Sequence, residues 1–269
     1  MGEKPILVLG ATGSTGRRVA ALLGERGYPV RAASRRGRVR FDWADPSTWE
    51  GAVDGAGAMY LMAPDGVPIA PEFVELAVRR GVRRIVLLSS RAIEEMGDER
   101  LLAAERTVKG CGVDWTVLRC DWFDQNFDEG FLVESVRAGR IALPLDGVRQ
   151  AFVDADDIAA VAVAALTGDG HAGRVYEVTG PEALSFGEAA EVIGRVVGYP
   201  VRYDSDPEAF VRDQVAAGLP REGAEAAVGA FEALVAMGDG VPGDDVLRVT
   251  GRAPKPFSDY AVRAAPAWA

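Results

Sequence analysis

The stretch VLGATGSTGRR, residues 8–18, sets Gly10, Gly13 and Gly16 directly after a short apolar run. An apolar strand that enters a glycine turn and leaves it as a helix forms the first unit of a dinucleotide-binding fold. The first glycine permits the sharp turn, the second lets the backbone approach a pyrophosphate, and the third lets the helix pack closely on its strand. Free amides at the helix N-terminus would then bind the phosphates. Additional hydroxyl donors lie between the glycines at Thr12, Ser14 and Thr15.

The end of the predicted second strand indicates which dinucleotide is preferred. An NAD site usually places an acidic residue there, about 20 residues after the glycines, to accept from the ribose 2′-hydroxyl. This chain has Ser34, Arg35 and Arg36 at that place. An arginine cannot accept a hydrogen bond, but it pairs in a bidentate manner with a 2′-phosphate. The pattern therefore predicts NADP(H) in preference to NAD(H), with a solvated turn as the alternative role for the arginines.

Short apolar runs alternate with helical segments through the first half of the chain. The expected strands cover 6–10, 30–34, 39–41, 58–62, 84–90 and 115–119, and the expected helices cover 15–26, 71–80 and 94–109. Unbroken apolar strands that alternate with helices predict a parallel sheet buried on both faces. With right-handed crossovers, this is an α/β fold of the Rossmann type, a doubly wound parallel sheet.

The second half predicts a smaller, mostly helical lobe. We expect helices over 156–166, capped by Asp156, and from Ser185, in a capping box with Glu188, to about 198. Further expected elements are a strand at 174–178, helical segments over 207–238 broken at 218–220, a loop at 238–245 and a terminal helix at 256–264. Residues 1–150, with strand and helix returns over about 151–180, would form the NADP(H)-binding core. A discontinuous α/β substrate lobe within 120–269 would pack over the C-terminal edge of the sheet.

The composition of the chain limits which partners, location and metal sites we expect. The formal net charge is −10, which disfavours a phosphate backbone, so no nucleic-acid partner is expected. There is no apolar run of about 18 residues, so we expect no membrane span. The N-terminal apolar run is too short for a signal sequence, and the two cysteines fit reduced thiols in a cytoplasmic protein. His171, the only histidine, lies in a glycine-rich turn, and no metal site is expected. The expected partner is therefore a small-molecule substrate. The sequence does not distinguish a monomer from a homodimer.

Several longer motifs carry a family resemblance. They are GATGSTG to SRRG, RIVLLSS (84–90), GVDWTVLRCDWFDQNF (112–127), AFVDADDIAAVAVAAL (151–166) and GRVYEVTGPEALSFGEAAEVIG (173–194). Together they resemble the NmrA-like branch of the atypical, extended short-chain dehydrogenase/reductase superfamily. The chain is also similar to NAD(P)H-binding proteins of the clavine dehydrogenase type. The resemblance covers about residues 5–205.

The resemblance implies a set of cofactor contacts. The pyrophosphate would touch Gly10, Thr12, Gly13, Ser14 and Thr15, with Gly16 beneath them, and the 2′-phosphate would touch Ser34 and Arg35. Asp42 and Trp43 would flank the adenine, with a turn or cap role as the alternative for Asp42. The adenosine ribose would lie against Met62, Ala63 and Pro64, and the nicotinamide near Ser89, Ser90 and Arg91.

The chain departs from the wider superfamily at its catalytic pair. Most members use a Tyr-x-x-x-Lys pair in which the tyrosine donates a proton. Here Leu101 and Glu105 occupy the two places. Glu105 would then be a helix-face residue or face the active site. The candidate catalytic residues are Glu105, Asp121 and Arg91, and the candidate substrate contacts are Trp122, Phe123 and Phe127. The aromatic residues could equally form core, and Asp124 could cap the following helix.

Several reactions with a nicotinamide cofactor need no proton donor from the protein. Hydride can reduce an iminium carbon directly, because the substrate already carries the positive charge. A quinone or flavin-like acceptor can take its proton from solvent. We therefore expect an NADPH-dependent reductase of a small, flat, conjugated or iminium-type substrate. The alternatives are an NADPH:quinone reductase, an NmrA-type redox sensor that binds NADP(H) without catalysis, and an isomerase or lyase that holds NADP as a structural group.

Overall fold

The computed structural model describes residues 4–269, so residues 1–3, where the segment considered for a targeting signal begins, lie outside the described part. A seven-stranded sheet with the order β3-β2-β1-β4-β5-β6-β9 organises the fold, and every neighbouring pair in it is parallel. Its strands are β1 (Ile6–Val8), β2 (Val30–Ser34), β3 (Val39–Arg40), β4 (Ala58–Leu61), β5 (Arg84–Ser90), β6 (Asp114–Cys120) and β9 (Arg174–Val178). The predicted doubly wound parallel sheet is confirmed.

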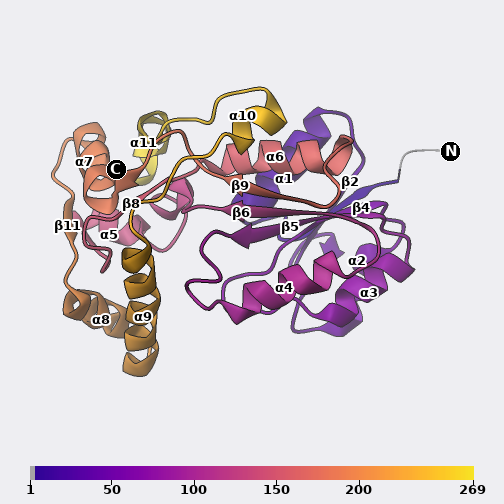
Figure 1. Cartoon of the computed structure of the whole chain (residues 1–269), viewed down its shortest axis with the longest axis horizontal. Helices are drawn as coiled ribbons and strands as arrows, with labels where there is room; N and C mark the ends of the chain where they lie inside the picture. The colour runs from indigo at the N-terminus through magenta and orange to yellow at the C-terminus, as the bar shows by residue number, and fades with distance from the viewer. Residues whose placement is uncertain (1–3) are drawn as a thin grey trace.

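Helices cover both faces of this sheet (Figure 1). One face carries α1 (Ser14–Glu25), α6 (Ala155–Thr167) and α10 (Asp245–Thr250), and the other carries α2 (Trp49–Val53), α3 (Pro71–Arg79) and α4 (Glu99–Lys109). Strand β1 shows why helices must pack on both faces of the sheet. Ile6 and Val8 belong to the apolar cluster on the first face, while Leu7 and Leu9 belong to the cluster on the second. Alternate side chains of one apolar strand therefore point into two cores.

A lobe with its own apolar core adjoins the C-terminal side of the sheet (Figure 1). Its helices are α5 (Val133–Arg137), α7 (Phe186–Val197), α8 (Pro207–Ala216), α9 (Arg221–Met237) and α11 (Phe257–Ala264). Two short strand pairs join them, β7 (Arg140–Ala142) with β11 (Arg202–Asp204) in parallel and β8 (Arg149–Gln150) with β10 (Leu184–Ser185) in antiparallel. Single 3₁₀ turns occur at Pro46–Thr48, Asp124–Asn126 and Ala265–Ala267. The assignment of this lobe to the substrate stays a prediction.

Two helix starts differ from the sequence prediction. Asp154, not Asp156, caps α6, because its side chain accepts from the amide of Asp156 at 2.8 Å. The expected helix at 94–109 begins only at α4, where Asp98 accepts from the amide of Leu101 at 3.0 Å. The capping box of α7 is confirmed, with both reciprocal hydrogen bonds present. The break between α8 and α9 also lies at the predicted Gly-Leu-Pro sequence, residues 218–220.

Candidate cofactor and substrate site

The glycine turn brings the backbone of α1 very close to the chain that leaves β1, and the side chain of Met62, after β4, packs against the turn. Gly10 has a φ of +62°, and a Cβ there would lie 2.4 Å from Sδ of Met62. A Cβ on Gly16 would lie 2.2 Å from the carbonyl oxygen of Gly10. Gly13 caps α1 without a side chain, so no side-chain acceptor covers the amides of the first turn. These amides, together with the positive end of the helix dipole, fit a pyrophosphate group.

The hydroxyl residues of this turn differ in exposure. Thr12 is exposed, Ser14 is half-buried and Thr15 is buried. The hydroxyl of Ser14 donates to Oε2 of Glu129 at 2.9 Å. The structure therefore places all three around the first turn of α1, and their contacts with a cofactor stay predictions.

The basic stretch from β2 to β3 contains arginines of two kinds. Arg31 donates to the carbonyl oxygen of Ala52 at 2.8 Å, and Arg40 pairs with Asp45 at 3.2 Å. Arg35 and Arg36 are exposed, and neither takes part in an ion pair within residues 4–269. Ser34, the last residue of β2, is buried beside them. An exposed guanidinium without a carboxylate partner is suited to bind an external phosphate.

The residues predicted for the adenosine half lie together. Nε1 of Trp43 donates to the carbonyl oxygen of Met62 at 3.3 Å, and the side chain of Met62 rests against Gly10. Ala63 and Pro64 follow at the same strand end. Asp42 accepts from the amide of Ala44 at 3.0 Å, so its side chain also has the turn role that the sequence left open.

Glu105 forms a buried ion pair. Only 2% of the residue is exposed, so it does not lie on a solvent-exposed helix face, and its place at the active site stays a prediction. Its carboxylate accepts from the guanidinium of Arg119 through two bonds of 2.8 Å, from Nζ of Lys109 at 2.7 Å and from the hydroxyl of Ser89 at 2.8 Å. Burial alone would raise the pKa of Glu105, but these hydrogen bonds lower it to about 2. Near neutral pH the carboxylate is ionised and fully engaged, so it is a poor proton donor.

Arg91 and Asp121 form a second pair at the ends of β5 and β6. Nη1 of Arg91 lies 2.8 Å from Oδ2 of Asp121, and Nε lies 3.1 Å from Oε2 of Glu177. Arg91 also donates to the carbonyl oxygen of Val241 at 3.3 Å, which ties the strand ends to the loop before α10. Burial raises the pKa of Asp121, against the opposing effect of Arg91. Ser90, next to this pair, donates to the carbonyl oxygen of Arg91 at 3.2 Å. The catalytic roles of Arg91 and Asp121 stay predictions.

The three aromatic candidates lie in different surroundings. Trp122 is half-buried, with ring centroids 6.3 Å from Phe131 and 6.2 Å from Phe231 of α9. Phe123 packs at the margin of the core between the sheet and α6. Phe127 has no exposed surface and lies in the lobe core, so the structure places it away from any surface that a substrate could contact. Trp122 and Phe123 are both half-buried, and Phe131, the neighbour of Trp122, is 56% exposed.

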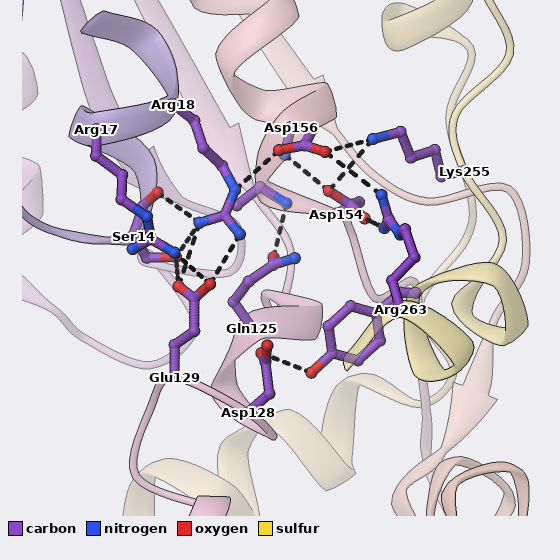
Figure 2. A network of polar contacts seen from close by, with 12 residues as sticks. Ser14, Arg17, Arg18, Gln125, Asp128, Glu129, Asp154, Asp156, Lys255 and Arg263 are labelled. Carbon is purple, nitrogen blue, oxygen red and sulfur yellow. Dashed lines mark hydrogen bonds and ion pairs between the residues drawn. The ribbon is translucent and has the colours of Figure 1, made fainter. Parts of the chain in front are cut away.

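Beside the glycine turn lies a polar network that the sequence did not indicate (Figure 2). Its members are Ser14, Arg17, Arg18, Gln125, Asp128, Glu129, Asp154, Asp156, Lys255, Tyr260 and Arg263. Asp124 lies near it, fully buried, and among residues 4–269 neither of its carboxylate oxygens has a hydrogen-bond partner. Burial raises the pKa of Asp124 well above its ordinary value, and the nearby Asp154 and Asp157 raise it further. Asp124 therefore does not cap a helix.

A cavity and two free cysteines lie outside the set of residues predicted for cofactor and substrate. A cavity of about 550 Å³ lies in the lobe, lined by Pro144, Asp146, Asp204, Ser205, Asp206, Pro207, Val228, Glu232 and Val235. It includes none of the residues predicted for cofactor or substrate. Cys111 and Cys120 are free thiols. Within residues 4–269, no three histidine, cysteine or acidic side chains are grouped to hold a metal ion, and no helix is long and apolar enough to cross a bilayer.

The sequence of the chain was matched to a protein family and to individual relatives. The profile of the NAD(P)H-binding family matches residues 10–169, from the first glycine of the turn to the end of α6. A (4-alkanoyl-5-oxo-2,5-dihydrofuran-3-yl)methyl phosphate reductase of Streptomyces griseus is 34% identical, over 98% of this chain and 99% of its own length. Festuclavine synthase II of Penicillium roqueforti is 33% identical, over 98% of this chain and 99% of its own length.

Solved structures share the fold at lower identity. An NADPH-dependent quinone oxidoreductase from Escherichia coli superposes with a TM-score of 0.73 at 21% identity, over 96% of this chain and 98% of that one. A mutant of NmrA superposes with a TM-score of 0.72 at 15% identity, over 99% of this chain and 96% of that one. Both folds therefore extend over the sheet and the lobe.

Proposed function

The chain belongs to the NAD(P)H-binding family and is an oxidoreductase, and from that premise we propose an NADPH-dependent reductase that transfers hydride to a small, flat, conjugated or iminium-type substrate. The transfer would proceed without a tyrosine–lysine proton donor. A small-molecule partner is part of the proposal, because the net charge of −10 disfavours nucleic acid. A cytoplasmic location completes it, and the free thiols of Cys111 and Cys120 fit a reducing compartment.

One observation supports an iminium or quinone acceptor rather than a simple carbonyl. On α4 the two places of the usual catalytic pair hold Leu101 and the ionised, fully hydrogen-bonded Glu105. A carbonyl reduced to an alcohol needs a proton at its oxygen as the hydride arrives, and general acids supply it in most related enzymes. An iminium carbon needs no such proton, and a quinone is electrophilic enough to take one from water. The site therefore favours an acceptor of one of these two kinds.

The cofactor half of the proposal rests on the glycine turn and on Arg35. The amides at the start of α1 suit the pyrophosphate, and the exposed, unpaired guanidinium of Arg35 suits a 2′-phosphate. Trp43 and Met62 would flank the adenosine, and Ser89 and Ser90 would lie near the nicotinamide. Bound there, NADPH would supply the hydride. The protein would supply orientation and exclude water.

The substrate half rests on the accessible aromatic side chains. Trp122 and Phe131 offer flat faces on which a conjugated or cationic ring can stack. Asp121 lies beside Trp122, and its charge is balanced by Arg91. The relatives fit this class, since one is named as a clavine synthase and a structural neighbour as a quinone oxidoreductase.

Turnover with a panel of acceptors tests the proposal. The purified protein is mixed with NADPH and an iminium salt, a quinone or a simple ketone, and loss of the reduced-cofactor absorbance is followed. We expect turnover with an iminium or quinone acceptor and none with the ketone. Turnover with the ketone as the preferred acceptor would contradict a mechanism without a proton donor. Tight NADPH binding with no turnover on any acceptor would favour the NmrA-type sensor instead.

A further inference from the structure

A carboxylate of the lobe holds the first turn of α1 (Figure 2). Oε2 of Glu129 accepts from the hydroxyl of Ser14 at 2.9 Å. Oε1 of Glu129 lies 2.8 Å from Nη2 of Arg18 and also pairs with Arg17. These donors lower the pKa of Glu129 although burial opposes them, so the side chain is an anion near neutral pH. A negative charge thus already occupies the side-chain donors of this turn.

The same turn is where the dinucleotide's pyrophosphate belongs under the proposed function. Ser14 is among the residues of the glycine motif, and its amide belongs to the uncapped start of α1. A pyrophosphate bound to these amides would bring a second anion beside Glu129. Two like charges a few ångströms apart at a partly exposed site cost roughly tenfold in binding affinity. The carboxylate and a bound pyrophosphate would therefore be two anions at one turn of helix, the first on its side-chain donors and the second on its amides.

Glu129 is also bound firmly to the lobe. It lies between the 3₁₀ turn Asp124–Asn126 and α5, and its amide donates to the carbonyl oxygen of Gln125 at 2.9 Å. The next residue towards the N-terminus, Asp128, accepts from the hydroxyl of Tyr260 on α11 at 2.8 Å. Phe127 and Leu132, on either side, are buried in the lobe core. Glu129 thus belongs to a segment that is anchored in the lobe core and follows Trp122 along the chain.

We propose that Glu129 is a competitor of the dinucleotide pyrophosphate, which holds α1 while the cofactor is absent and is displaced when it binds. The inference rests on the proposed function, because it needs a dinucleotide at α1. Arg18 has a second carboxylate partner, Asp156 of α6 at 2.8 Å, which stays when Glu129 is neutralised. Arg18 would thus keep an ion pair within the sheet domain after the loss of this one charge.

Equilibrium titration of Glu129→Gln with NADPH and with adenosine 2′-phosphate tests the inference. The second ligand carries the adenine and the 2′-phosphate but no pyrophosphate. We expect Glu129→Gln to bind NADPH about tenfold more tightly than the unaltered protein. Its affinity for adenosine 2′-phosphate should stay the same. The matched control is Glu134→Gln, which removes the same charge five residues further on, from an exposed side chain paired with Arg137. This control should leave both affinities unchanged.

Three other results of these titrations would overturn the inference, each for a different reason. Equal or weaker NADPH binding by Glu129→Gln, with a folded protein, would show that the carboxylate does not compete. Equal tightening of both ligands would indicate the general field of the protein rather than competition at the pyrophosphate. Failure of both the unaltered protein and Glu129→Gln to bind NADPH would instead reject the proposed function, and the inference with it.

Discussion

Replacing Gly16 by alanine should damage both the fold and the cofactor site, because α1 and β1 meet there without room for a side chain. The added Cβ would lie 2.2 Å from the carbonyl oxygen of Gly10, 2.6 Å from its carbonyl carbon and 2.9 Å from the carbonyl oxygen of Leu9. All three are backbone atoms, so no side chain can turn aside to make space.

The size of the effect follows from these distances. An ordinary contact starts near 3.4 Å, so α1 must withdraw from β1 by about 1 Å. Overpacking of this kind costs about 1–3 kcal/mol of the free energy of unfolding. The same shift moves the amides of the first turn of α1 away from the place where the pyrophosphate would bind. A displacement near 1 Å weakens such hydrogen bonds strongly, so we expect the Kd for NADPH to rise at least about tenfold.

Gly24 provides a matched control in the same helix. A Cβ there meets nothing within 4 Å, so Gly24→Ala makes the same chemical change without a clash. It should raise the free energy of unfolding by about 0.5–1 kcal/mol, because alanine restricts the unfolded chain. Denaturant unfolding and NADPH titration of both variants make the comparison. Equal stability and equal NADPH affinity in Gly16→Ala and Gly24→Ala would refute the reasoning about close contact between helix and strand.

Three further changes test other parts of the structure. Glu105→Gln should lower the free energy of unfolding by about 2–3 kcal/mol at neutral pH, because Arg119 loses its buried partner, while NADPH affinity measured by titration stays nearly unchanged. The pKa of Glu105 is lowered to about 2, so this stability difference should be complete above about pH 5 and shrink as the pH falls towards 2; a difference that does not depend on pH would contradict the ion pair. Asp124→Asn should raise the stability at neutral pH, because the raised pKa of Asp124 means that the fold loses stability as the pH rises above the ordinary aspartate range. Equal denaturation midpoints for Asp124→Asn and the unaltered protein from acid to neutral pH would show that Asp124 is not strained. Trp122→Ala should raise the KM for a flat acceptor at least about fivefold with little change in the Kd for NADPH, and the reverse pattern would place Trp122 at the cofactor.

Local sequence was enough for the parts of the fold that depend on neighbours along the chain. The glycine turn follows β1 and precedes α1 directly, so its three glycines predict the geometry on their own. The capping box of Ser185 and Glu188 is local in the same way. The family resemblance rested on such motifs as well, and the matches along nearly the whole chain confirm that it belongs with NAD(P)H-binding proteins.

Contacts between distant residues could not be predicted. The role of Glu105 depends on Arg119, which lies opposite Ser89 in the register of β5 and β6, and a single sequence does not show that register. Glu129 and Arg18 are 111 residues apart, and each looks like an ordinary surface charge in the sequence. Phe231 reaches Trp122 only because α9 packs back on the lobe.

The N-cap of α6 shows a further limit of prediction from sequence, at the level of single residues. Three aspartates lie at 154, 156 and 157, and each is a residue type that caps helices. The backbone decides among them, because Asp154 has the extended conformation of a cap (φ −69°, ψ 131°) and accepts from the amide of Asp156. Asp156 is left free to bind Arg18 and Lys255.

The most direct test of the account is the affinity of the chain for NADPH and for NADH, measured by titration before and after Arg35→Glu. The account predicts that the unaltered protein prefers NADPH, and that Arg35→Glu weakens NADPH binding at least about tenfold while NADH binding changes little. Arg38→Glu, the same charge change in an exposed arginine three residues on, should have the smaller effect. Equal losses for both dinucleotides, or equal effects of the two variants, would contradict the assignment of Arg35 to the 2′-phosphate. Failure to bind either dinucleotide would contradict the site as a whole.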